Sequence, residues 1–309
     1  RIVTGLVLGG GVLTCLILGG LPFFIMLMTI ALLAQIEFYQ LFWKGASHLF
    51  SKVTGLVCGA GIIALASGML PENIAVHLSV QGLLIGATLI ACFFFLLDYG
   101  RDNDEATLGE YALLPMGILY VPLLFSMAYG LTLTEMLLVA CAVAASDTAA
   151  YFTGCAIGNH RIWPSVSPKK SWEGAIAGFF ACVLVVFGIG WFAVHGGPGI
   201  QEAAQAGADT AEGSAALLDT MRTYMPDAAS LLYWLLVGAA VAIAAQFGDF
   251  FESAIKRSAN VKDSSQLLPG HGGFLDRIDS LLFGFPVYLL MKNSLSTDAC
   301  AALLAHFSQ

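Results

Sequence analysis

The 309-residue chain is 58% hydrophobic and only 11% charged, and its mean hydropathy is +0.81. A soluble domain carries roughly 25% charged residues, so this chain has too few charges to cover a water-exposed surface. The composition excludes a soluble enzyme, a disordered chain and a coiled coil, and the net charge of −8 argues against nucleic-acid binding. We expect an integral membrane protein.

Continuous apolar runs of about 18–25 residues, without strict alternation, predict membrane-spanning helices rather than the strands of a β-barrel. We therefore expect an all-α, polytopic membrane protein with about nine transmembrane helices. The predicted spans, in chain order, are residues 2–19, 21–43, 53–70, 74–97, 107–130, 132–155, 174–195, 229–250 and 274–292. Only Gly19, Gly20 and Pro22 interrupt the first two spans, which predicts a tight helical hairpin.

The basic residues predict the orientation, because short cytoplasmic loops of membrane proteins carry an excess of Lys and Arg. Ten of the 13 basic residues fall in loops that we expect to lie inside. They are Lys44, Lys52, Arg101, Arg161, Lys169, Lys170, Lys256, Arg257, Lys262 and Arg277. Outside lie Arg222, Lys292 and an acidic, Ala/Gly-rich segment at 196–228. The polar face of the protein is therefore expected to be cytosolic.

Carboxylates mark the late spans, although an ionisable residue at the centre of a spanning helix costs about 2.5–3.5 kcal/mol. Five lie at or near predicted inside ends: Asp147, Asp249, Glu252, Asp276 and Asp279. Asp249 and Glu252 share a helix face, as do Asp276 and Asp279, because each pair is three residues apart. Such oxygen ligands suit Mg²⁺, which usually takes one or two carboxylates plus substrate phosphate. The alternative is that these acids pair with basic neighbours such as Arg277.

Basic and small residues cluster in the same inside loops. The segment SPKKSWEG at 167–174 precedes one span, and Lys256, Arg257, Lys262 and the HGG sequence at 271–273 lie between the last two spans. Lys and Arg side chains, together with exposed N–H groups of Gly and Ser, suit phosphate oxygens. Ser171 is also placed to cap the helix that follows it. The alternative is simple anchoring of these loops to anionic lipid head groups.

Acids and bases at one membrane face indicate metal-assisted phosphoryl or nucleotidyl transfer. The sequence contains no P-loop of the form G-x-x-x-x-G-K-[ST], and neither H-E-x-x-H nor G-x-S-x-G occurs. A P-loop enzyme, a zinc protease of that pattern and a serine hydrolase of that pattern therefore find no support.

The 27 residues from Ser253 to Asp279 read SAIKRSANVKDSSQLLPGHGGFLDRID. This stretch resembles the signature of the phosphatidate cytidylyltransferases, or CDP-diacylglycerol synthases: S-x-apolar-K-R-x4-K-D-x-small-x2-apolar-P-x-H-G-G-apolar-x-D-R-apolar-D. Every fixed position is matched. Residues 146–154, 167–174 and 246–253 also resemble segments of that family, whereas the N-terminal half matches only in hydropathy and weakly at Glu37-Phe38-Tyr39.

The resemblance implies that CTP and phosphatidic acid give CDP-diacylglycerol and pyrophosphate, with Mg²⁺ required and a second metal ion left open. The catalytic residues that it implies are Asp249, Asp276, Lys170 and Arg277. The implied metal ligands are Asp249 and Asp276 first, with Asp279 and Asp147 as further candidates. The implied substrate-binding residues are Ser167, Lys169, Lys170, Ser171, Lys256, Arg257, Lys262, His271, Gly272 and Gly273. For His271 the alternative is a structural role in its loop.

The matching segments lie in the C-terminal half of the chain. We expect one integrated bundle, with N-terminal transmembrane helices at 1–130 and catalytic transmembrane helices at 131–309. The expected partners are CTP, phosphatidic acid and the lipid bilayer, without nucleic acid, and a homodimer is left open. We expect a bacterial inner (plasma) membrane protein whose active site faces the cytosol.

Two other functions remain as alternatives. A CTP-dependent polyprenol or phytol kinase would transfer the γ-phosphate to an alcohol and release CDP, and the complete signature at 253–279 argues against it. A transporter would use buried acids along a midplane pathway, but the polar residues here lie late in the chain and on one side. A CDP-alcohol phosphotransferase would need D-x-x-D-G-x-x-A-R, which the sequence lacks.

Overall fold

The computed structural model describes residues 2–45, 48–102, 107–195, 231–267 and 272–295. In these ranges all regular elements are helices, so the predicted all-α class is confirmed. In chain order they are α1 (Ile2–Leu18), α2 (Gly20–Phe42), α3 (Leu49–Ser67), α4 (Glu72–Ala75), α5 (Val80–Asp102), α6 (Leu108–Ile118), the π-helix η1 (Leu119–Leu123), α7 (Leu124–Ser126), the 3₁₀-helix η2 (Met127–Gly130), α8 (Leu133–Ile157), α9 (Trp172–His195), α12 (Leu231–Ser258) and α13 (Leu275–Ser294).

Seven helices within the described ranges are long and apolar enough to cross a membrane. They cover residues 20–42, 49–67, 80–100, 108–130, 133–157, 172–189 and 231–258. The apolar part of α1 is shorter, at Gly9–Leu18, and α13 begins with the charged residues Asp276, Arg277 and Asp279. The polytopic membrane architecture is therefore confirmed, whereas the predicted count of nine spans is not.

Several helices begin or end at residues other than the predicted ones, because of a glycine cap and a short additional helix. The segment predicted at 53–70 ends early because Gly68 takes a left-handed conformation, with φ of 68°, and caps α3. A short helix, α4, follows, so α5 begins only at Val80 instead of residue 74. The predicted hairpin between the first two spans is confirmed, because α1 and α2 pack against one another. Gly19, between the helices, and Gly20, the first residue of α2, make the turn with φ of 60° and 49°.

Backbone contacts divide the chain into two compact units. Unit 1 comprises Arg1–Tyr129 and Glu252–Leu282, and unit 2 comprises Gly130–Phe251 and Phe283–Gln309. Helices α12 and α13 each contribute one part to unit 1 and the other part to unit 2. The division predicted at residue 130 stays a prediction.

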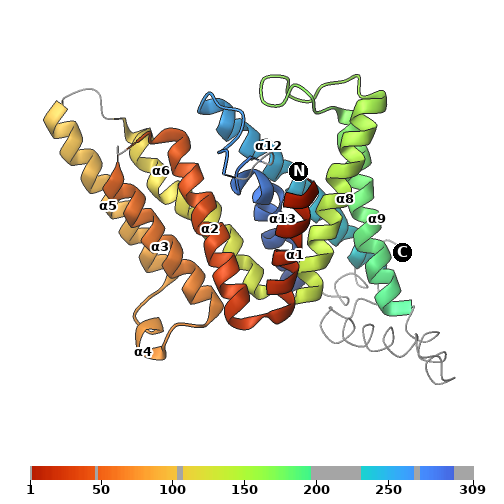
Figure 1. Cartoon of the computed structure of the whole chain (residues 1–309), viewed down its shortest axis with the longest axis horizontal. Coiled ribbons are helices and arrows are strands. Elements are labelled where there is room, and N and C mark those ends of the chain that lie inside the picture. The colour runs from red at the N-terminus through yellow and green to blue at the C-terminus, as the bar shows by residue number, and fades with distance from the viewer. Residues whose placement is uncertain (1, 46–47, 103–106, 196–230, 268–271, 296–309) are drawn as a thin grey trace, which may run out of the picture. The chain divides into compact units, whose positions relative to one another are not determined.

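In unit 1, α2, α3, α5 and α6 run side by side (Figure 1). Tyr39 on α2 donates a hydrogen bond to the Leu114 carbonyl on α6 at 2.9 Å, and Gln35 donates to the Gly55 carbonyl on α3 at 3.0 Å. Gly55 and Gly117 lie directly against the Tyr39 ring, where a Cβ atom would overlap it. Small residues thus let these helices approach a buried aromatic side chain closely.

In unit 2, α8 and α9 lie along one another (Figure 1). A Cβ atom at Gly178 would lie 2.8 Å from the Ser146 carbonyl oxygen, and one at Gly174 would lie 2.7 Å from the Ala150 carbonyl oxygen. The α8–α9 contact is therefore a close backbone approach made by glycines on α9. At the start of α8, Thr132 and Glu135 form a capping box, which accounts for the accurately predicted beginning of this helix.

Candidate active site

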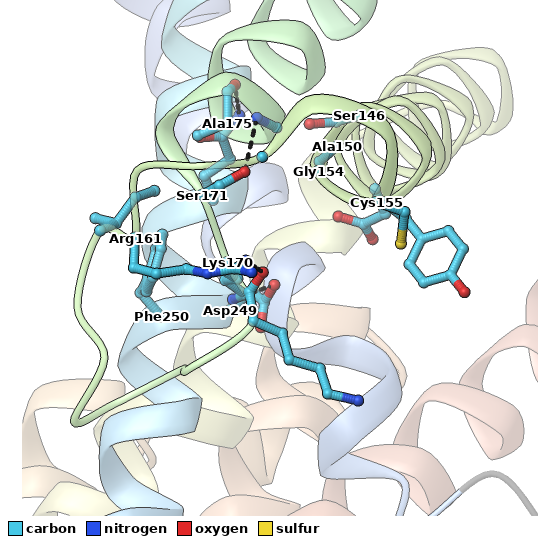
Figure 2. Close-up of a pocket in the computed structure, with 17 residues that line it drawn as sticks. Ser146, Ala150, Gly154, Cys155, Arg161, Lys170, Ser171, Ala175, Asp249 and Phe250 are labelled. Carbon is cyan, nitrogen blue, oxygen red and sulfur yellow. Dashed lines mark hydrogen bonds and ion pairs between the residues drawn. The ribbon is translucent and has the colours of Figure 1, made fainter.

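Unit 2 contains a pocket of about 630 Å³ that combines α8, α12, the start of α9 and the chain between α8 and α9 (Figure 2). Its lining residues are Ser146, Asp147, Ala150, Tyr151, Gly154, Cys155, Gly158, Arg161, Ile162, Lys169, Lys170, Ser171, Gly174, Ala175, Gln246, Asp249 and Phe250. Three of the four segments that resemble the cytidylyltransferase signature segments, 146–154, 167–174 and 246–253, therefore contribute to one cavity.

Helical periodicity explains the contribution of α8. Ser146, Ala150, Gly154 and Gly158 follow one another at intervals of four, so they lie along a single stripe of the helix and its C-terminal cap. Asp147 lies beside this stripe and is exposed, as a carboxylate facing a cavity would be. The small residues of the stripe lie against the start of α9 and Ser171, so they bring these pocket-lining segments together.

An ion pair occupies the polar part of the pocket. The Lys170 Nζ atom lies 2.5 Å from a carboxylate oxygen of Asp249, and Figure 2 shows the two side chains pointing toward one another. Their side chains keep 28% and 31% exposure, respectively, so both remain open to a ligand. The same ammonium group lies 4.2 Å from the centre of the Phe250 ring, a cation–π contact that helps to fix its position.

Hydrogen bonds within the segment between α8 and α9, and from it to the start of α9, fix its conformation. The Arg161 guanidinium donates to the Lys169 carbonyl at 2.6 Å, and the Trp172 N–H donates to the His160 carbonyl at 2.9 Å. The His160 Nδ1 atom also lies 2.6 Å from the Glu173 carboxylate. These contacts hold Lys169 and the residue that follows it at the pocket rather than leaving them on a free loop.

Ser171 caps α9, as the sequence predicts. Its Oγ atom accepts the Gly174 N–H at 3.2 Å, and its carbonyl accepts the Ala175 N–H at 2.9 Å. Ser171 is buried and lines the pocket together with Lys169 and Lys170. Ser167 is not among the lining residues; its N–H donates to the Trp163 carbonyl at 2.9 Å.

Unit 1 holds a second polar cluster, built on the 253–279 signature. The Asp276 carboxylate accepts hydrogen bonds from Lys256 Nζ at 2.7 Å, the Gly273 N–H at 2.7 Å and Ser264 Oγ at 2.9 Å. Lys256 also forms an ion pair with Glu252, which is fully buried. Lys256 and Asp276 thus hold the end of α12, the loop after it and the start of α13 together.

Glu37 on α2 also belongs to this cluster, although it was not among the predicted site residues. Its carboxylate is fully buried and accepts hydrogen bonds from Ser264 Oγ, Ser265 Oγ and the N–H groups of Phe274 and Leu275, at 3.1, 2.6, 3.0 and 2.8 Å. The available signal was its position: it is the carboxylate inside an otherwise apolar span, where charges are expensive.

The other predicted site residues of unit 1 lie around the start of α13 and the end of α12. Arg257 is exposed and donates to the Val261 carbonyl at 3.0 Å, and Lys262 is exposed. Arg277 is exposed on the first turn of α13, and the Asp279 carboxylate accepts the N–H of the next residue. Their predicted contacts with substrate or metal stay predictions.

Gly272 and Gly273 are required by the backbone itself. Gly272 has φ of 80°, a left-handed conformation that L side chains rarely adopt. A Cβ atom at Gly273 would overlap both Glu37 and Ser264. These two glycines therefore serve the conformation of the loop, whatever they contact in addition. His271 lies outside the described residues.

The donor set of the pocket suits a hard cation. Among the described residues, no group of three or more His, Cys, Asp or Glu side chains is arranged to hold a metal ion. Asp147 and Asp249 nevertheless line the same pocket, and Mg²⁺ usually needs only one or two protein carboxylates beside substrate phosphates. The oxygens of Asp276 already accept hydrogen bonds from four protein groups. The pocket thus fits Mg²⁺ better than the second cluster does.

Comparison with known proteins agrees with these motifs. The model of the cytidylyltransferase family matches residues 1–295. A phosphatidate cytidylyltransferase of Staphylococcus aureus is 29% identical over 281 residues, which cover 89% of this chain and 91% of the relative. One from Bacillus subtilis is 28% identical over 302 residues, covering 94% of this chain and 96% of the relative. One from Thermotoga maritima is 42% identical over 147 residues, covering 47% and 44%.

The family match spans both units and includes all four motif segments, so the resemblance inferred from the sequence is confirmed. The relatives' names also confirm that this is a nucleotidyltransferase family of enzymes. The chain belongs to the cytidylyltransferase family.

Proposed function

We propose that this protein transfers the cytidylyl group of CTP to phosphatidic acid, giving CDP-diacylglycerol and pyrophosphate. The names of its relatives support these substrates. The observation that carries the proposal is the pocket of unit 2, where Asp147, Lys170 and Asp249 come from three separate motif segments and line one cavity. Such a mixture of acids and bases suits a reaction between two phosphate groups.

The reaction needs little help from a general base, because the nucleophile is already an anion. An oxygen of the phosphatidate phosphate, already anionic, forms a bond to the α-phosphorus of CTP. The bond from that phosphorus to the oxygen bridging the α and β positions breaks, and pyrophosphate leaves with the electron pair. The barrier comes from repulsion between two polyanions and from charge that builds up on the leaving group.

The basic residues of the pocket address this barrier. Lys170, Lys169 and Arg161 line the cavity and bring positive charge to the phosphates. The Lys170 ammonium is held by Asp249 and by the Phe250 ring, so little reorganisation is needed when the substrate binds. Lys170 is therefore our first choice for stabilising the charge of the transferring group.

Asp147 and Asp249 would hold the Mg²⁺ that the resemblance implies. When bound there, the ion would neutralise phosphate charge and stabilise the leaving pyrophosphate. Asp276 and Asp279 remain further candidates as ligands. In this proposal Asp249 both orients Lys170 and offers oxygen to the ion.

We also propose that the pocket faces the cytosol of a bacterial cell, at the inner membrane. Ten of the 13 basic residues fall on the same side as the 158–171 chain in the predicted topology. Tyr151, Trp163 and Trp172 are exposed on or beside the pocket-forming segments, and such aromatic residues concentrate at membrane–water interfaces. CTP would enter from water and the lipid laterally from the leaflet.

Product analysis tests the proposed function. Purified protein in mixed micelles is incubated with phosphatidic acid, Mg²⁺ and CTP that is labelled separately at the α or γ phosphate. We expect the α label to enter the lipid while the γ label is released in pyrophosphate. Transfer of the γ label to an added prenol, with CDP released, would establish a kinase instead. Transfer of neither label by folded protein would overturn the proposal.

A further inference from the structure

We propose that Glu37 is a positioning residue for the transfer reaction, a role that rests on the proposed function. It lies on α2, far from the motif segments in sequence, yet its carboxylate contacts the loop within the 253–279 signature. Its four hydrogen-bond partners all lie between residues 264 and 275.

The hydrogen bonds match a carboxylate and no other side chain of that size. The Oε1 atom accepts from Ser265 Oγ and the Phe274 N–H, and the Oε2 atom accepts from Ser264 Oγ and the Leu275 N–H. An ionised carboxylate is an acceptor at both oxygens, so it satisfies two donors on each. A glutamine has the same shape, but in either orientation its NH₂ group would face a backbone N–H that cannot turn away.

Because Glu37 is fully buried, its carboxylate depends on these hydrogen bonds. Glu37 has no exposed surface, and an unpaired charge in such a place would be strongly unfavourable. The loop comes so close that Gly273 has no room for a Cβ atom beside Glu37. The carboxylate and the glycine therefore form a matched pair, one supplying the acceptors and the other the space.

Ser264 links Glu37 to the catalytic candidates of unit 1. Its single Oγ–H is shared between Glu37, at 3.1 Å, and the Asp276 carboxylate, at 2.9 Å, and its N–H donates to Asp276 at 3.1 Å. Asp276 in turn holds Lys256 at 2.7 Å. Glu37 thus fixes the loop through which Asp276 and Lys256 are oriented, without itself touching the substrate.

The test compares two buried carboxylates changed in the same way. Glu135 on α8 is also fully buried, pairs with Lys292 at 2.8 Å and has no part in the proposed site. Glu37→Gln and Glu135→Gln are purified, and their thermal stability, kcat and KM for CTP are measured. We expect Glu37→Gln to lower kcat by about 10- to 100-fold with little change in KM, because small displacements of oriented groups are costly to the rate. Glu135→Gln should lose stability while keeping its kcat.

A coupled variant identifies the route of the effect. If Glu37 acts through Ser264, adding Ser264→Ala to Glu37→Gln should lower kcat by much less than it does in the wild type. Fully additive losses would overturn this route. If Glu37→Gln fails to fold, Ser265→Ala removes one of the four donors and should lower kcat by a smaller factor.

The outcomes separate this inference from the proposed function. Wild-type protein that transfers no α label to lipid overturns the function and the inference together. Wild-type protein that transfers the label, with Glu37→Gln and Ser265→Ala at wild-type kcat, overturns only the positioning role. A loss of kcat in Glu37→Gln that Glu135→Gln shares at equal loss of stability would reduce Glu37 to a structural residue.

Discussion

Lys170 is the residue on which the charge balance of the pocket depends. Asp147 and Asp249 bring two carboxylates to a cavity that is proposed to bind polyanions, and the Lys170 ammonium compensates one of them directly. Neither partner of the Lys170–Asp249 pair is deeply buried, so the pair can exchange its contacts when a ligand arrives. The Lys170–Asp249 pair is therefore expected to contribute more to function than to the stability of the fold.

Replacement of this lysine should damage the reaction more than replacement of its neighbour. We expect Lys170→Ala to lower kcat/KM by about 100-fold or more, because it removes a cation that stabilises developing charge. Lys169→Ala should have a smaller effect, since Lys169 is exposed at the pocket rim. Lys44→Ala, in another predicted inside loop, is the control, and steady-state kinetics are the measurement. An unchanged rate in Lys170→Ala would favour the lipid-anchoring alternative.

The two carboxylates of the pocket should control the response to Mg²⁺. We expect Asp147→Asn and Asp249→Asn to raise the Mg²⁺ concentration for half-maximal activity by about 10-fold or more, since each removes a charged oxygen ligand. Glu72→Gln, an exposed change on the short helix α4, should leave this concentration unchanged. If both variants keep the wild-type Mg²⁺ dependence, the ion binds to residues other than Asp147 and Asp249.

At the scale of elements, the glycines of α9 decide how closely it approaches α8. Gly174 and Gly178 face backbone carbonyls of α8 at distances where a Cβ atom would collide. The residues of α8 that they touch, Ala150 and Ser146, also line the pocket. The same residues of α8 therefore form both the contact with α9 and part of the pocket wall.

An added methyl group at this contact should be costly. We expect Gly178→Ala to destabilise the protein by about 1–3 kcal/mol, as overpacking of a close contact does. Gly188→Ala on the same helix is the matched control, because a Cβ atom there meets no other atom within 4 Å. Thermal unfolding in detergent measures both variants. If the two variants are equally stable, α8 and α9 can move apart to accommodate the added methyl group at little cost.

For the whole molecule, the predicted topology places the pocket on the cytosolic side of the membrane. Cys155 lines the pocket and is exposed, so it can report that side directly. Ser294, exposed at the end of α13, is predicted to lie on the opposite side. Two variants, each with a single cysteine at one of these positions, can therefore be compared in vesicles of known orientation.

A membrane-impermeant thiol reagent should label Cys155 from the cytosolic side only, and CTP with Mg²⁺ should protect it. The cysteine of a Ser294→Cys variant should be labelled from the other side and should not be protected. Labelling of Cys155 from the outside would reverse the predicted topology. Equal labelling with and without CTP would remove Cys155, and with it this end of α8, from the binding site.

The membrane environment, the all-α class and the family could all be predicted from the sequence alone. Hydropathy over a helix length reports lipid burial, and the 253–279 signature is a fixed local pattern that needs no fold to be recognised. The start of α8 and the cap at Ser171 were also predictable, because capping depends on residues only three positions apart.

Which of the motif residues share a cavity depends on how the helices pack. Spacing along the chain could not show that Asp147, Lys170 and Asp249 line one pocket, because three different elements bring them there. Nor could it show which groups Glu37 contacts, because its partners are more than two hundred residues away in sequence. Hydrogen bonds and ion pairs between distant segments depend on how helices pack, and helix packing is a property of the fold rather than of any local pattern.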